Sequence, residues 1–202
     1  MSTKYQAIVW LLIILLAGTA GCSSAPVIPP PETAVVPTPP EAPNTPDQVR
    51  LKDGLTGREL SPGEAAELSD RLLASGNEVT DQDMARLELV LLKALKNPDK
   101  AHQAVLWRNL GIIHYHQKKY KQARQELQAS NELNPKSART HYYLARLFIH
   151  QGQIYERQGK KGVSKQQFKR AAIEMEMARK LEPSNPIYRQ DIRQTVGQGQ
   201  GR

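Results

Sequence analysis

From residue 61 onward, apolar residues recur every three or four positions, which is the period of helices with one buried face. The first stripe follows Ser61-Pro62-Gly63-Glu64, where a serine N-cap, an early proline and a glutamate three residues later form a capping box. A second stripe runs from Asp81 to Lys96 and ends at Asn97-Pro98. The alternation that strands require is scarce, so the pattern predicts an all-α fold.

The stretch after residue 98 carries one longer pattern twice. The first copy is Trp107-x2-Leu110-Gly111-x2-His114, then Ala123-x3-Leu127 and Pro135, and the second is Leu144-Ala145-x2-Phe148, then Ala171-x3-Met175, Ala178 and Pro183. This spacing resembles the tetratricopeptide repeat (TPR), a helix–turn–helix of about 34 residues. The resemblance implies a TPR-like α-hairpin solenoid, with Gly111 and Ala123 small because two antiparallel helices cross closely there.

The second copy is longer than the first. Pro135 and Pro183 are 48 residues apart, about 14 more than one repeat, which predicts about two extra turns in each helix. We expect the turn at residues 159–162, with Ser164 capping the return helix. Residues 186–196 are expected to form a terminal helix that covers the last repeat.

The first residues indicate export. An apolar run of 11 residues from Ala7 follows Lys4; a transmembrane helix needs about 20, so the run reads as the core of a signal peptide. The next residues, LAGTAGC, resemble a bacterial lipobox, although Thr19 stands where leucine is usual. The resemblance implies cleavage before Cys22 and lipidation of Cys22, including palmitate. Because Ser23 is not aspartate, it also implies the periplasmic face of a Gram-negative outer membrane. An uncleaved membrane anchor is the alternative.

The proline distribution separates a tether from the helical part. Nine of the 14 prolines lie in residues 26–46, where a packed core cannot form; a spacer is the simpler interpretation and a PxxP ligand the alternative. The predicted organisation is a signal peptide (1–21), the lipidated cysteine and a disordered tether (22–59), an N-terminal helical hairpin that is a degenerate repeat or a cap (60–98), two TPR-like hairpins plus a capping helix (99–196), and a disordered tail (197–202).

No catalytic arrangement is apparent. The only cysteine is the one expected to carry lipid, and no P-loop, HExxH, GxSxG or metal-ligand spacing occurs. We therefore expect no enzyme activity, no cofactor and no metal.

The charge distribution suggests the chemistry of a partner. The chain has 28 basic and 20 acidic residues, a net charge of +8, and 17 basic against 6 acidic residues lie in 98–180. Such an excess attracts nucleic acid, but a periplasmic lipoprotein meets none. The expected partner is a protein or peptide with an acidic or carboxylate-bearing segment; peptidoglycan or anionic lipid is the alternative, and a merely solvated basic face is the simplest interpretation.

Two surfaces are candidates for binding. In TPR proteins the first helix of each repeat lines a groove, and the resemblance places these residues on it: Arg108, Asn109, Ile112, Tyr115, Arg139, Tyr142 and Arg146. Arginine forks and tyrosines suit a carboxylate-bearing peptide. The second surface is the basic tip of the longer hairpin, comprising Arg157, Lys160, Lys161, Lys165, Lys169 and Arg170. The expected function is a scaffold or assembly factor for an envelope complex, with pilotins of pilus and secretion machines as one analogy.

Overall fold

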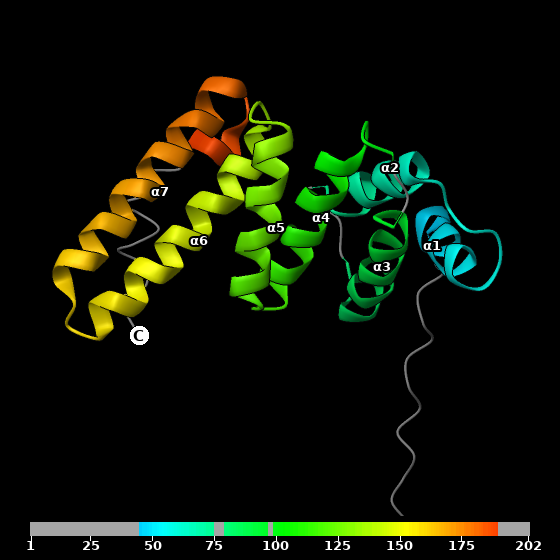
Figure 1. The fold of residues 1–202 in the computed structure, drawn as a ribbon, viewed down its shortest axis with the longest axis horizontal. Helices are drawn as coiled ribbons and strands as arrows, with labels where there is room; N and C mark the ends of the chain where they lie inside the picture. Colours follow the sequence, from blue (N-terminus) through cyan, green and yellow to red (C-terminus); the bar gives the residue numbers. More distant parts are fainter. Residues whose placement is uncertain (1–44, 75–78, 97–98, 190–202) are drawn as a thin grey trace, which may run out of the picture. The chain divides into compact units, whose positions relative to one another are not determined.

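The structure is a computed structural model that describes residues 45–74, 79–96 and 99–189, all within one compact unit (Figure 1). The predicted signal peptide, Cys22, the proline-rich part of the tether and the C-terminal tail lie outside the described residues. The described ranges contain helices and no strand, which confirms the predicted all-α, TPR-like hairpin fold. The helices are α1 (Pro46–Thr56), α2 (Pro62–Leu72), α3 (Asp81–Ala94), α4 (Gln103–His116), α5 (Tyr120–Leu133), α6 (Ala138–Arg157), α7 (Lys161–Leu181) and a 3₁₀ helix, η1 (Pro186–Arg189).

Neighbouring hairpins stack on one another, as repeat proteins do. Helix α2 packs on α3 and α4, α4 packs on α5, and α6 packs on α5 and α7; Figure 1 shows α4–α5 and α6–α7 as successive hairpins. The N-terminal part of the core contains Leu68, Leu87, Leu91, Leu106 and Leu110, all with at most 1% of their surface exposed.

A glycine sets the distance between α4 and α5. A Cβ on Gly111 would lie 2.7 Å from Leu127 Cγ and 3.2 Å from the Ala123 carbonyl oxygen. Ala123 and Leu127 are fully buried. The predicted close crossing is therefore present, and a side chain at position 111 would force its neighbours to shift.

The second hairpin is longer than the first, since α6 and α7 have 20 and 21 residues and α4 and α5 have 14 each. The turn contains Gly159 at φ 72°, a left-handed conformation that glycine adopts without strain. The expectation that Ser164 caps the return helix is wrong: α7 already begins at Lys161, and Ser164 is a buried residue inside it. Because Gly159 completes the turn early, the chain is helical before it reaches the serine.

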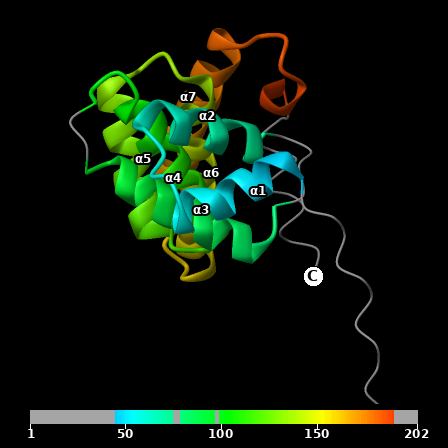
Figure 2. The same cartoon turned by 90° about the vertical axis from the view of Figure 1, so that its right-hand side faces the viewer.

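The predicted disordered tether extended too far. It was expected to reach residue 59, but residues 46–56 form α1, which starts with a complete capping box between Thr45 and Gln48. Leu51 is fully buried, and Gln48 Nε2 donates to Asp83 Oδ2 of α3 at 2.9 Å. The helix is held by contacts with α3, seen beside it in Figure 2, and these contacts leave no signal in the local proline-rich composition.

The C-terminal cap also differs from expectation. The predicted α-helix over 186–196 begins as the 3₁₀ helix η1, and residues from 190 onward lie outside the described part. Tyr188 is buried against Ala138 and Ala178, and Arg179 Nε donates to the Tyr188 carbonyl oxygen at 2.8 Å. In the residues described, none of the helices has both the length and the apolar character that crossing a bilayer requires.

Candidate protein-binding face

The predicted groove residues lie on α4 and α6, which with α2 are the first helices of the three hairpins. We call the surface that α4 and α6 form with α2 on the side of these residues the first-helix face. Ile112 is buried in the core, with 1% of its surface exposed. The structure places the other six predicted residues in two clusters, each with its own hydrogen-bond partners.

In the first cluster, Asp70 of α2 pairs with two of the predicted arginines. Arg108 donates to its carboxylate, and Arg139 lies within 3.5 Å of the same oxygen while also donating to the Leu73 carbonyl. Asn109, fully buried, donates to Asp70 at 2.9 Å. This cluster ties α2 to α4 and α6, so Arg108 and Arg139 hold the hairpins together.

A polar cavity of about 430 Å³ opens beside this cluster. Its lining includes Arg108, Arg139 and Lys136 together with Asp70 and Glu182. Because cations and carboxylates both line it, the cavity offers hydrogen bonds to a ligand but only a small excess of positive charge.

In the second cluster, Arg146 is held by two tyrosine hydroxyl groups. Its Nε donates to Tyr115 Oη at 3.0 Å, and its Nη1 donates to Tyr142 Oη at 2.9 Å. The guanidinium carbon also lies 5.3 Å from the centroid of the Tyr115 ring, within the range of a cation–π contact. No ion pair to Arg146 occurs among the described residues, so its charge is oriented without being neutralised.

The electrostatics of this cluster keep it in one charge state. Burial opposes the charge of Arg146, but the hydroxyls of Tyr115 and Tyr142 outweigh burial and raise its pKa. Burial raises the pKa of Tyr115 although Arg146 opposes it, and burial raises the pKa of Tyr188, beside Tyr142, to about 12. At neutral pH, this cluster therefore presents the Arg146 cation beside the neutral phenol of Tyr115.

Buried His114 joins three helices behind this face. Its Nδ1 lies 2.6 Å from Glu126 Oε2 of α5, and its Nε2 lies 3.2 Å from Glu88 Oε1 of α3. Ionised carboxylates only accept hydrogen bonds, so both ring nitrogens donate and the geometry fits the imidazolium form. Burial lowers the pKa of His114, but the two glutamates outweigh it and the pKa is raised.

His141 joins the two helices of the α6–α7 hairpin in a similar way. Its Nδ1 lies 2.6 Å from Glu174 Oε2, and its Nε2 donates to the Pro135 carbonyl oxygen at 2.9 Å. The hydrogen bond to Glu174 raises its pKa against the effect of burial. Across residues 45–74, 79–96 and 99–189, no set of three or more His, Cys, Asp or Glu residues is placed to hold a metal ion.

The basic tip lies at the α6–α7 turn. Its predicted residues are all exposed: Arg157, Lys160, Lys161, Lys165, Lys169 and Arg170. Lys161, Lys165 and Lys169 follow one another at intervals of four on α7, so they share one side of the helix. None of the six forms an ion pair with another described residue, which leaves the tip strongly cationic.

Sequence reasoning missed the acidic partners of these groups. Asp70 is 38 residues from Arg108, and Glu174 is 33 residues from His141, so no local spacing could have indicated either pair. It also missed a cavity between α5 and α6, whose α6 lining follows the helical spacing of Leu147, Gln151 and Ile154.

Comparison with known proteins agrees with the hairpin geometry. Residues 104–137 match the family model described as tetratricopeptide repeat; this range covers nearly all of α4, all of α5 and the turn into α6. No curated protein matches the chain. The chain thus contains a TPR within an all-helical hairpin fold, and a TPR indicates a role in binding other proteins.

Proposed function

We propose that this chain is a lipid-anchored adaptor of the bacterial envelope, which binds an acidic segment of a partner protein on its first-helix face. The TPR at residues 104–137 supports a protein partner. The observation that carries the choice of surface is Arg146, a cation that Tyr115 and Tyr142 orient and that no described carboxylate neutralises. A carboxylate of the partner would neutralise the charge of Arg146 and accept charge-assisted hydrogen bonds from its guanidinium group.

Capture from cross-linked cell envelopes tests this proposal. Full-length protein and an Arg146→Gln variant are compared with Arg157→Gln, which removes the same charge from the exposed end of the same helix. A partner enriched by the wild type and by Arg157→Gln but lost with Arg146→Gln supports the first-helix face. Equal capture by all three, with the helical circular dichroism unchanged, refutes it. Arg139 is unsuitable for this test because its loss would also disturb the contacts to Asp70 and Leu73.

The anchor is proposed from the lipobox-like segment alone. Cleavage before Cys22 and acylation of its sulfur and amino group would hold the protein on the periplasmic face of the outer membrane, because two or more acyl chains give stable attachment. Metabolic labelling with radioactive palmitate should mark the wild type and not Cys22→Ser, and the variant should leave the membrane fraction. Labelling of both proteins, or membrane retention of Cys22→Ser, would contradict this part of the proposal.

Assembly of a pilus or secretion channel is the envelope process we propose, by analogy with pilotins. The capture experiment tests this assignment against other envelope processes. A secretin or pilus subunit among the Arg146-dependent partners supports the assignment. A partner from another envelope machine keeps the adaptor function and rejects the pilotin analogy.

The basic tip favours a second candidate function, binding to peptidoglycan or anionic lipid. The observation that favours this function is the row formed by Lys161, Lys165 and Lys169. All three are exposed and form no ion pairs in the described part of the chain. Sedimentation with purified peptidoglycan or phosphatidylglycerol vesicles should fall with added salt and in the triple Lys→Gln variant. The matched control is the triple Lys→Gln variant at positions 93, 96 and 100, exposed residues elsewhere on the chain; equal loss in both triples would reject the tip.

A further inference from the structure

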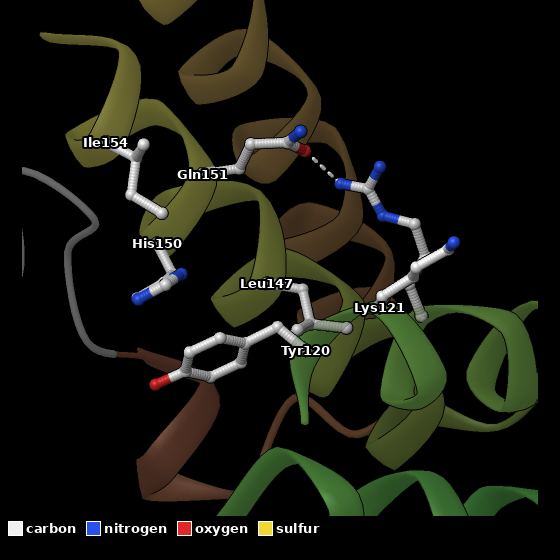
Figure 3. Close-up of a pocket in the computed structure, with 7 residues that line it drawn as sticks. Tyr120, Lys121, Leu147, His150, Gln151 and Ile154 are labelled. Atoms are coloured by element: carbon white, nitrogen blue, oxygen red, sulfur yellow. Dashed lines mark hydrogen bonds between the residues drawn. The ribbon is translucent and has the colours of Figure 1, made fainter. Parts of the chain in front are cut away.

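A second cavity lies outside the two clusters, between α5 and the C-terminal half of α6 (Figure 3). Its volume is about 250 Å³, and its lining includes Tyr120, Lys121 and Arg124 of α5 with Leu147, His150 and Ile154 of α6. The first turn of α5 faces residues 147–154 here, so the last turn of the longer α6 continues past the start of α5. The cavity is thus a product of the elongated hairpin.

The inner part of the cavity is apolar and aromatic. Leu147 is buried and Ile154 is half-buried. In Figure 3, Tyr120 and His150 lie on one side of Leu147, and Lys121 lies on the other side. The rings of Tyr120 and His150 lie with centroids 3.9 Å apart at an angle of 36°. Their contact fixes one wall of the cavity before any ligand arrives.

The rim of the cavity is cationic without a counter-charge. Lys121 and Arg124 supply its positive charge, and no carboxylate lines it. His150 also lines it, but burial lowers the pKa of His150, so its imidazole adds no charge at neutral pH. Half-buried Arg124 donates to the amide oxygen of Gln151, and its guanidinium carbon lies 5.1 Å from the centroid of the Phe148 ring; it forms no ion pair within the described ranges. Burial lowers the pKa of Arg124, and the charge of Arg170 lowers it further, yet a guanidinium stays charged at neutral pH.

Size and chemistry together select the occupant. Pockets for whole small molecules usually measure about 300–1,000 Å³, so a cavity of 250 Å³ suits a single large side chain. A free anion would use the cations and leave Leu147 and Ile154 unused, whereas paired acyl chains would not fit. A peptide that places an apolar side chain beside carboxylates uses both parts of the site.

We propose that this cavity anchors an acidic segment of the protein partner, which inserts one aromatic or large aliphatic side chain onto Leu147 and Ile154 while its neighbouring carboxylates pair with Lys121 and Arg124. The inference rests on the proposed function, because it assigns a specific contact to the same partner. Since both walls are helices that are already packed, little ordering opposes binding.

Defined peptides test the specificity of the site. Fluorescence anisotropy measures binding of labelled Glu-Glu-Phe-Glu-Glu to the full-length protein in detergent, beside Glu-Glu-Ala-Glu-Glu and Gln-Gln-Phe-Gln-Gln. We expect each control peptide to bind about tenfold more weakly, because burial of a phenyl group and pairing of carboxylates each contribute. Equal affinity of the phenylalanine and alanine peptides would mean that only net charge is recognised, which overturns the proposal.

Paired substitutions then locate the contact. Ile154→Ala should weaken the Glu-Glu-Phe-Glu-Glu peptide about fivefold and leave the alanine peptide unchanged; Arg124→Gln should weaken it similarly and leave the glutamine peptide unchanged. The matched controls are Ile173→Ala, at an exposed apolar residue of α7, and Arg58→Gln, at an exposed arginine in the α1–α2 connection. Equal effects of Ile154→Ala on both peptides would refute the anchor. Arg124-dependent binding of phosphatidylglycerol vesicles, together with equal affinity for the phenylalanine and alanine peptides, would also refute it.

The same variants separate this inference from the proposed function. Envelope capture that survives both Ile154→Ala and Arg124→Gln but is lost in Arg146→Gln refutes the anchor and keeps the adaptor. Peptide binding with the expected pattern, together with no Arg146-dependent partner in envelopes, keeps the anchor and refutes the proposed first-helix contact.

Discussion

Substitution of Gly111 by alanine tests the close crossing of α4 and α5. The added Cβ would lie 2.7 Å from Leu127 Cγ and 3.2 Å from the Ala123 carbonyl oxygen. Leu127 is fully buried, and the nearest atom is its branching carbon, so the side chain cannot simply swing away. Overpacking of this kind costs about 1–3 kcal/mol, while alanine gains about 1 kcal/mol over glycine in helix propensity.

We place this clash in the upper part of the overpacking range, because a backbone carbonyl is also close. The net effect is then a loss of about 1.5 kcal/mol in the free energy of unfolding. For a domain of this size, that loss lowers Tm by about 3–6 °C. Urea denaturation followed by circular dichroism at 222 nm measures the loss, with the slope against urea concentration unchanged.

Gly162 of α7 provides the matched control. Nothing lies within 4 Å of a Cβ built there, and the residue is helical, so Gly162→Ala should leave stability unchanged or raise it by up to about 1 kcal/mol. A double variant, Gly111→Ala with Leu127→Ala, should be less destabilised than the sum of the single variants, because the new methyl group partly fills the cavity left by the leucine. If Gly111→Ala is as stable as Gly162→Ala, or if the double variant is simply additive, the steric reasoning is wrong.

Three further predictions follow from contacts between helices. Asp70→Asn should lower the free energy of unfolding by about 1–2 kcal/mol, a value kept small by the partial exposure of Asp70. Arg108→Gln should lower this free energy less in the Asp70→Asn variant than in the wild type, because its partner is already changed. Because the pKa of His114 is raised on folding, its contribution to stability is complete below its unfolded value of about 6.5 and is lost as pH rises through the folded value; the fall of stability above pH 6.5 should be shallower in His114→Gln than in the wild type. Leu51→Ala should cost about 2–5 kcal/mol, measured by urea denaturation, and should expose the α1 amides to hydrogen exchange; an unchanged stability would mean that α1 is not part of the folded unit.

Much of the fold could be predicted from the sequence because its determinants are local. The capping box at Ser61 and Glu64 is present as expected, and the glycine of the repeat pattern does mark the helix crossing. The 48-residue spacing between Pro135 and Pro183 likewise corresponds to the longer α6 and α7. Each of these signals lies within a few residues or depends on the period of a helix, so it can be read without knowing what packs against it.

The candidate site was predicted less well. The resemblance placed six polar residues on the first helices, but it gave Arg139 and Arg146 the same expected role as groove residues. In the structure, Arg139 pairs with Asp70 of another hairpin, whereas Arg146 is held by tyrosines. Which arginine keeps an available charge depends on residues tens of positions away, and side chains on one helix give no sign of them.

The sequence by itself determined the helical period, the antiparallel hairpins and the basic excess of residues 98–180, because these follow from composition and from neighbours within one or two turns. Only the tertiary structure decided that α1 joins the core, that His114 lies between two glutamates, and that Arg124 stays without a counter-charge beside an apolar cavity. The physical reason is that burial and charge compensation depend on groups brought together by folding, and their separation along the chain carries no record of that contact.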